Sequence, residues 1–400
     1  MLRIRILTVM GIVSGLALSE AQAQSYLSQN RLSFSKRLNG QLESIADARQ
    51  REFDEPDKVF SLGITMGTRG SRVEDDNIKS STSATALNVD LIWNATTWVR
   101  WDLSAGFQFA SGQSQAVYGG EGNPYTGPTV NEAAFTLKPN ESFDFSAGLV
   151  ATEFNPILST FGGDALAGFR QVLRFESGIF QTSLRAYQAV PTQINQSNRI
   201  LDDANDSSAI ITNMNVGFVG ERTELQMSYT KWDFYRMSSA AAADSRFLGN
   251  TMVGDGSGRN MFFQYRFQGR EVAAGFAQKF RLDDRLSLKG TMIQNDQAPE
   301  KRNLGWMSQT SYLYNFGRYS FRPAVTRFRL EPDVIPAFYS IGTFGFTNRD
   351  GYAGELRGMI RRYNLEGFIR FVDAKEVEPR FVQSDRVGYT LGMEVKYEIL

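Results

Sequence analysis

The chain has 400 residues, with 43 basic and 43 acidic side chains, no Cys and no His. The lack of Cys and His excludes thiol or imidazole catalysis, disulfides, and zinc or iron–sulfur sites built on these ligands. A net charge of zero argues against broad electrostatic binding, so we expect no nucleic-acid partner.

The composition favours β-structure. The chain contains 30 Phe, 15 Tyr and 36 Gly, and abundant aromatic residues and glycine suit strands joined by many turns. Hydrophobic residues make up only 42%. A transmembrane β-barrel has such an average, because half of each strand faces lipid and half faces water.

Residues 1–23 have the three parts of a secretory signal peptide. Two arginines precede an apolar stretch at 6–18, and Ala21-Gln22-Ala23 fits an A-x-A cleavage site. The alternative is a membrane anchor, but a spanning helix needs about 20 apolar residues and this stretch is shorter. We expect export, cleavage, and a mature chain that starts at Gln24.

Residues 24–57 differ from the segments on either side. Leu38, Leu42 and Ile45 recur at helical spacing among charged residues, which predicts a short amphipathic helix near 35–52. We interpret 24–57 as a periplasmic N-terminal segment that is partly helical. A plug and an oligomerising helix stay open as alternatives.

From residue 58 to residue 400, many apolar residues recur at every second position. In the last segment seven of them stand in phase, with only small or polar residues between them. A helix would scatter these residues around its axis, so the segment is predicted to be a strand with one apolar and one polar face. The seven are Val387, Tyr389, Leu391, Met393, Val395, Tyr397 and Ile399.

The predicted strands are joined by short turns and by long, polar loops in alternation. This alternation is typical of transmembrane β-barrels, with short turns in the periplasm and long loops outside the cell. The short turns are at 94–96, 138–142, 220–222, 283–285, 315–318 and 361–363, and the long loops are at 68–83, 111–129, 151–167, 188–207, 235–258 and 332–349.

Residues 58–400 therefore predict an all-β fold, a transmembrane antiparallel β-barrel. At roughly 19–21 residues per strand and connection, the segment holds 16 to 18 strands, and we expect 16. One question stays open between residues 235 and 285. Either 245–253 hides a strand, or 259–281 is one long bent strand.

Many charged residues stand between the apolar positions. A dry core could not hold them without a severe desolvation cost, whereas a barrel of about 16 strands encloses an aqueous channel. The alternative, an exported soluble sandwich, is disfavoured because aromatic residues gather near strand ends, as at membrane interfaces. The inward set has ten basic and six acidic members, a weak lean towards anions: Arg100, Asp102, Glu132, Asp144, Arg170, Arg174, Arg185, Lys279, Lys289, Arg322, Glu355, Arg357, Glu366, Arg370, Glu394 and Lys396.

The signal peptide, alternating strands, unequal connections and amphipathic last strand together resemble Gram-negative outer-membrane porins over residues 58–400. Residues 131–139, followed by 143–149, resemble the paired strands before the third outer loop of substrate-selective porins, loosely of the phosphate-selective type. One feature differs. Porin chains usually end in Phe, and this chain ends in Ile399-Leu400.

The resemblance implies a constriction in the lumen. In porins the third outer loop, here 151–167, commonly folds inward and faces basic residues of the wall, and narrow pores select by charge and diameter. No catalytic, cofactor-binding or metal-binding residue is expected. Eight residues become candidates for lining or constricting the pore: Arg100, Asp102, Glu132, Glu153, Asp164, Arg170, Arg174 and Arg185.

These features predict an outer-membrane porin, a water-filled channel through which small hydrophilic solutes or ions diffuse passively. We expect a homotrimer surrounded by outer-membrane lipid. Two alternatives stay open: a plugged barrel that transports hydrophobic substrates, and a structural or adhesive surface barrel. An enzyme is not expected, because the barrel enzymes of known families use a catalytic His, which this chain lacks.

Overall fold

The computed structural model describes most of the predicted barrel. The expected signal peptide and helical segment, residues 1–57, lie outside the described residues. The described residues are 59–74, 78–116, 126–150, 166–191, 207–245, 248–254, 261–280, 284–337, 340, 344–379 and 383–398.

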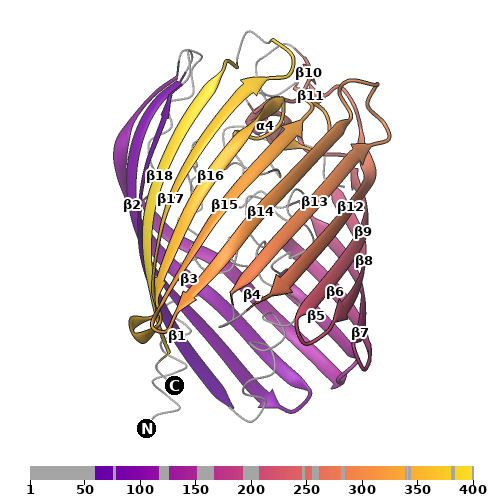
Figure 1. Ribbon diagram of the computed structural model, residues 1–400. Coiled ribbons are helices and arrows are strands. Elements are labelled where there is room, and N and C mark those ends of the chain that lie inside the picture. The colour runs from indigo at the N-terminus through magenta and orange to yellow at the C-terminus, as the bar shows by residue number, and fades with distance from the viewer. Residues whose placement is uncertain are drawn as a thin grey trace.

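Sixteen antiparallel strands form one closed barrel (Figure 1), which confirms the expected strand number. The barrel strands are β1 (Phe60–Glu74), β2 (Ile78–Thr96), β3 (Val99–Ala116), β4 (Gly127–Asn140), β5 (Phe143–Val150), β6 (Leu166–Ser177), β7 (Phe180–Val190), β8 (Ser208–Val219), β9 (Thr223–Tyr235), β12 (Phe267–Lys279), β13 (Arg285–Asn295), β14 (Leu304–Phe316), β15 (Tyr319–Leu330), β16 (Arg349–Ile360), β17 (Leu365–Glu376) and β18 (Arg386–Glu398).

The first and last strands pair with each other and close the barrel. Gly63 lies opposite Glu398, and Glu74 lies opposite Val387. Each of the sixteen strands therefore has a hydrogen-bonded neighbour on both sides. A sheet that crosses hydrocarbon needs this closure, because lipid offers no partner for a free backbone N–H or C=O.

Large apolar side chains cover the outside of the barrel. On β18, Tyr389, Leu391 and Met393 are 54%, 60% and 48% exposed. Side chains alternate across a strand, so Glu394 and Lys396 of the same strand point into the lumen. Long rows of exposed aromatic and aliphatic side chains suit lipid rather than water. The barrel is therefore a transmembrane barrel.

The two ends of the barrel differ. At one end, which we call the turn end, short hairpins join the strands, and Gly178 and Gly317 adopt left-handed φ angles of 59° and 62° in two of them. A short 3₁₀ helix, η6 (Arg361–Tyr363), makes another of these turns. The opposite end, which we call the loop end, carries longer connections (Figure 1). This difference agrees with the predicted alternation of turns and loops.

The prediction of a long loop at residues 68–83 is wrong. β1 and β2 continue through most of this segment, and only residues 75–77 separate them. The segment is rich in small polar residues, which favoured a loop in the sequence. In the structure these residues pair across the two strands. The Ser71 and Thr82 hydroxyls lie 2.8 Å apart, and Thr85 Oγ1 donates to Thr68 Oγ1 at 3.3 Å.

The open question between residues 235 and 285 is resolved by a small insertion at the loop end. A short helix, α4 (Ser239–Ser245), and a two-stranded sheet of β10 (Met252–Val253) and β11 (Phe262–Phe263) precede β12. No helix in the described part of the chain is long and apolar enough to span a membrane. The stretch 245–253 does contain a strand, β10, but this strand lies outside the barrel. The alternative of one long bent strand at 259–281 is wrong, because β11 and β12 are separate and β12 begins only at Phe267.

The strand orientation predicts different effects of arginine on the two faces of the barrel. Val325 is 61% exposed in the middle of β15 and faces lipid, so Val325→Arg should lower the free energy of unfolding by about 2–4 kcal/mol. Gln309 faces the lumen and donates to Thr326 Oγ1. Gln309→Arg should cost less than about 1 kcal/mol. Urea unfolding in lipid vesicles measures both, and equal losses would contradict the assigned faces.

Candidate functional site in the barrel lumen

Paired charges line the lumen on β3, β5 and β6. Arg100 donates to Asp102 Oδ1 from Nε at 2.8 Å and from Nη2 at 2.5 Å. Arg174 Nη1 donates to Asp144 Oδ2 at 2.5 Å across two strands. Both carboxylates are buried. Each pair lies near the turn end of its strands, so the wall there is charged but locally neutral.

A second group of charges lies where β9, β12 and β13 reach the turn end. Glu224 is buried, and Arg285 Nη2 donates to its Oε2 at 2.8 Å. Lys279 Nζ lies 3.7 Å from the other oxygen, Oε1. One carboxylate on β9 thus bridges cations from the next two barrel strands, β12 and β13.

The largest charged group is on β16 and β17. Glu355 accepts from Arg357 Nε at 3.0 Å and from Arg370 Nε at 2.8 Å, and Arg357 also pairs with Glu366. The Arg357 and Arg370 guanidinium carbons lie 5.3 and 5.5 Å from the centre of the Phe368 ring. The groups on both sides of the lumen are ionic, and such groups are stable where water shares their solvation.

The structure brings several predicted site residues together. Arg100 and Asp102 form one pair, and Arg174 is held by Asp144. Arg170 Nη2 donates to Ser146 Oγ at 3.2 Å. Glu132 and Arg185 also point into the lumen, from β4 and β7. Glu153 and Asp164 belong to residues 151–165, outside the described part of the chain.

The sequence reasoning missed several inward-facing charges, including one on each of β1, β2, β9, β12 and β13. Asp90 stands between the apolar Val89 and Leu91, so the alternation along this strand could have identified it as inward-facing. Glu224 likewise precedes the exposed Leu225. These five comprise three acids and two bases, so they do not add to the predicted excess of inward cations. The five are Arg69, Asp90, Glu224, Glu271 and Arg285.

Tyr187 on β7 joins the two ends of the third outer loop. Its ring has no exposed surface. Its hydroxyl donates to the carbonyl oxygens of Val150 at 2.9 Å and Leu166 at 3.1 Å, the last residue of β5 and the first of β6. These two strand ends are therefore held together from inside the barrel.

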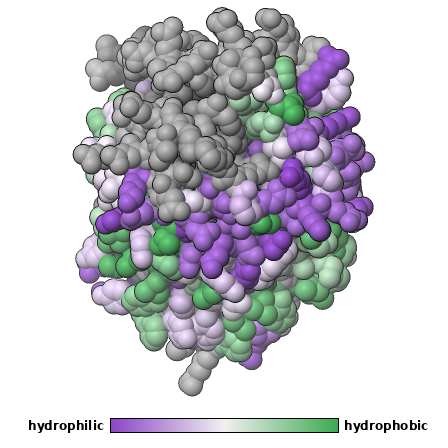
Figure 2. Space-filling view, turned by 90° about the horizontal axis from the view of Figure 1, so that it is seen from above, coloured by the Kyte–Doolittle hydropathy of each residue, from purple (hydrophilic) through white to green (hydrophobic). Residues whose placement is uncertain are grey.

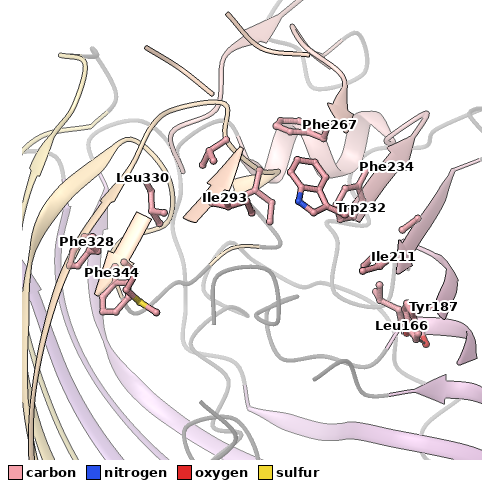
Figure 3. Close-up of a cluster of buried hydrophobic side chains, with 14 of the residues drawn as sticks. Leu166, Tyr187, Ile211, Trp232, Phe234, Phe267, Ile293, Phe328, Leu330 and Phe344 are labelled. Carbon is pink, nitrogen blue, oxygen red and sulfur yellow. Dashed lines mark hydrogen bonds between the residues drawn. The ribbon is translucent and has the colours of Figure 1, made fainter. Parts of the chain in front are cut away.

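Towards the loop end a buried apolar cluster covers much of the inward face, which differs from the charged lining predicted along the whole lumen. Trp232, Phe234 and Phe267 meet on one side, and Phe328 stacks on Phe344 on the other, with ring centres 4.2 Å apart (Figure 3). All belong to one buried cluster. The lumen wall thus has paired charges at the turn end and, at the loop end, a buried apolar cluster that charged residues such as Glu271 and Arg349 interrupt.

The outside of the barrel has a charged band at the loop end. Arg327 lies over the rings of Trp306 and Tyr352, at 5.3 and 4.5 Å, and Arg329 Nη1 donates to Asp350 at 3.3 Å. Seen from above, hydrophilic residues gather along this rim and hydrophobic ones along the flank (Figure 2). Such a change from apolar to charged side chains marks the level of lipid headgroups.

The buried ion pair on β5 and β6 should matter more than an exposed pair. Arg174→Gln leaves the buried Asp144 carboxylate without this cation, and we expect the free energy of unfolding to fall by about 2–3 kcal/mol. Arg72→Gln breaks a pair with Glu74 that is largely exposed, and should cost less than about 1 kcal/mol. Urea titrations followed by tryptophan fluorescence measure both losses. Equal losses, or no recovery in Arg174→Gln/Asp144→Asn, would contradict the assignment.

The fold is similar to known outer-membrane barrels. The chain aligns with OprB of Pseudomonas putida at 13% identity and a TM-score of 0.55, over 88% of this chain and 97% of that chain. A mutant of the Rh. blastica porin aligns at 13% identity and a TM-score of 0.46, over 84% and 100%. A loop-deletion mutant of OmpT, an outer membrane protein of Vibrio cholerae, aligns at 8% identity and a TM-score of 0.48, over 85% and 100%.

No family model and no curated protein sequence matches the chain. The likeness to OprB is one of fold, because the identity is low. With its sixteen-stranded closed sheet and lipid-facing exterior, the chain is a transmembrane β-barrel whose fold is similar to that of OprB.

Proposed function

We propose that the protein is an outer-membrane porin, a water-filled channel for passive diffusion of small hydrophilic solutes. One observation carries this proposal: buried and half-buried ion pairs line the turn half of a barrel whose outside is apolar. Charges in that arrangement need water on the inside. The barrel fold shared with OprB supports the same function.

The channel has a weak preference for anions, set by arginines that line its wall. Eight residues line or constrict the pore: Arg100, Asp102, Glu132, Glu153, Asp164, Arg170, Arg174 and Arg185. The ion pairs of Arg100 and Arg174 support this role, because rings of fixed charge select ions by sign. The preference for anions is weak, because arginines of the lumen wall such as Arg100, Arg174 and Arg285 form ion pairs with neighbouring carboxylates.

The turn end lies in the periplasm and the loop end outside the cell. The signal peptide, 1–23, is removed on export, and 24–57 stays in the periplasm. Three copies associate, as the resemblance to porins implies. The outward face of β5–β8 supports this assembly, because its described residues carry no charged side chain at the level of the charged band. That face suits a second copy, whereas the charged band suits headgroups.

One observation favours the alternative of a plugged barrel. A buried apolar cluster covers much of the inward face at the loop end, in contrast to the open, charged lining expected of a wide channel. A barrel closed there would pass no current. Conductance therefore separates the two candidate functions.

Single-channel recording in a planar bilayer under a KCl gradient tests the channel. We expect stable open steps, and a reversal potential whose sign shows a small excess of chloride current. Arg170→Gln should shift this potential towards cations, because it removes a fixed positive charge from the wall. Arg72→Gln on the outer surface is the matched control and should leave the potential unchanged. Absence of current from inserted, folded protein would reject the open channel.

A further inference from the structure

The segment Glu331–Ala337, which we call the ledge, follows β15 and lies inside the mouth of the barrel. Gly305 faces the lumen, and a Cβ built on it would lie 3.2 Å from Cγ2 of Val334. Val334, Ile335 and Ala337 have no exposed surface. The ledge therefore packs on the inner wall, whereas connecting loops commonly run over the surface of a protein.

The ledge has an apolar seat on three neighbouring strands. Val334 and Ile335 belong to the buried cluster that contains Ile293 of β13, Met307 of β14, and Phe328 and Leu330 of β15 (Figure 3). Burial of these side chains stabilises the inward position of the segment.

Asn250, from the insertion between β9 and β12, holds the backbone of the ledge. Its Nδ2 donates to the carbonyl oxygens of Pro332 at 2.7 Å and Ile335 at 2.9 Å, and its Oδ1 accepts from the Ala337 N–H at 2.6 Å. The side chain is buried. One amide therefore satisfies three backbone groups that would otherwise need water.

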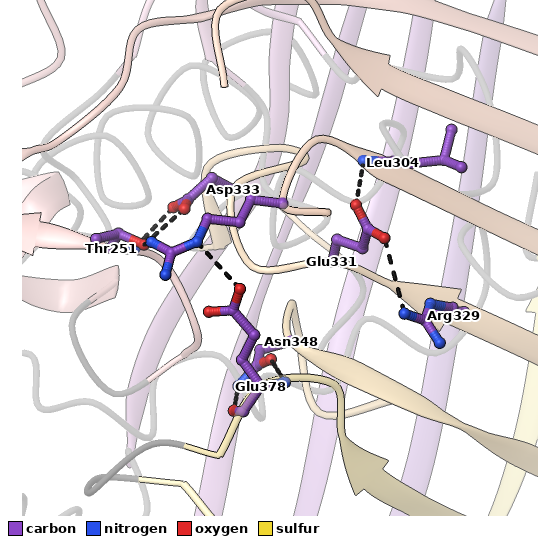
Figure 4. Close-up of polar contacts among 8 residues, drawn as sticks. Thr251, Leu304, Arg329, Glu331, Asp333, Asn348 and Glu378 are labelled. Carbon is purple, nitrogen blue, oxygen red and sulfur yellow. Dashed lines mark hydrogen bonds and ion pairs between the residues drawn. The ribbon is translucent and has the colours of Figure 1, made fainter. Parts of the chain in front are cut away.

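Asp333 makes the reciprocal contact from the ledge. Its carboxylate accepts from the Thr251 N–H at 2.7 Å and from Thr251 Oγ1 at 2.6 Å (Figure 4). Its own carbonyl oxygen accepts from Asn295 Nδ2 at 2.8 Å, and its N–H donates to the Arg302 carbonyl at 2.8 Å. We call the contacts of Asn250 and Thr251 with the ledge the clasp.

Two further loops support the clasp. Arg302 Nη1 donates to Thr251 Oγ1 at 3.2 Å, and its Nε donates to Glu378 Oε1 at 3.0 Å. Asn348, in the left-handed region at φ 60°, donates to the Glu378 carbonyl and accepts from the Glu378 N–H. Polar contacts thus join the connections β9–β12, β13–β14, β15–β16 and β17–β18 at the loop end. These contacts fix the position of the ledge.

The ledge presents no exposed charge in its described residues. Glu331 and Asp333 are both buried. Glu331 accepts from the Leu304 N–H at 2.9 Å and lies 3.8 Å from Arg329 (Figure 4). Neighbouring segments hold both carboxylates, so the ledge narrows the mouth by its volume and does not offer its charges to a passing solute.

We propose that the ledge, held by the clasp, sets the size limit for solutes at the outer mouth, while the ion pairs nearer the turn end set the charge preference. This inference rests on the proposed channel function. The solutes it limits are small hydrophilic molecules of either sign, because a ledge whose charges are buried discriminates by cross-section.

Two variants test the ledge in the full-length protein. Asn250→Ala/Asp333→Ala removes the clasp, and deletion of residues 332–336 removes the ledge itself. Glu300→Ala, at an exposed acid of a neighbouring loop, is the matched control. We expect the first two to raise single-channel conductance by about 1.5-fold or more and to admit larger polyethylene glycols, with an unchanged reversal potential. Heat-dependent gel mobility confirms that each barrel is folded.

The possible outcomes distinguish failure of the ledge proposal from failure of the proposed channel function. An unchanged conductance and size limit in the deletion variant would overturn the ledge proposal, as would a shifted reversal potential with an unchanged size limit. Current from the deletion variant but not from the wild type would reject the open channel and support the ledge as its obstruction. If neither the wild type nor any variant carries current, the channel function is rejected, and the role of the ledge with it.

Discussion

Backbone hydrogen bonds between β1 and β18 close the barrel, and the remaining features depend on this closure. Hydrocarbon offers no hydrogen-bond partner, so a strand at a free edge would leave a row of N–H and C=O groups unsatisfied. Once the sheet is closed, every side chain faces either lipid or lumen. The strict alternation along β18 follows from that division, since a shift of one residue would place Glu394 and Lys396 in lipid.

The lumen divides into two zones that stabilise different parts of the molecule. At the turn end, ion pairs such as Arg174–Asp144 keep the charges of the wall locally balanced. At the loop end, apolar side chains provide a seat on which connecting segments fold inward. Size and charge discrimination can therefore be located in different zones, and a change in one need not disturb the other.

The barrel could be predicted because its signal is local. A strand such as β18 shows its two faces in its own sequence, and turns such as the one around Gly317 follow directly. The prediction of a loop at 68–83 failed because small polar residues such as Ser71 and Thr82 are common in loops. Only the pairing of β1 with β2 shows that these two hydroxyls contact each other across a sheet. The clasp left no local pattern, since Asn250 and its ledge partners stand 82 to 87 positions apart. The roles assigned to Glu153 and Asp164 stay predictions.

The pairing of Gly63 with Glu398 also has a consequence for how the molecule is made. The two strands of this seam lie at opposite ends of the barrel sequence, so the seam forms only after all intervening hairpins are available. Until then the sheet has two open edges, each a template for pairing with another chain. Contacts of such long sequence separation are slow to form. Biogenesis of the barrel thus includes an interval of aggregation risk, and helper proteins that shield strand edges would act during it.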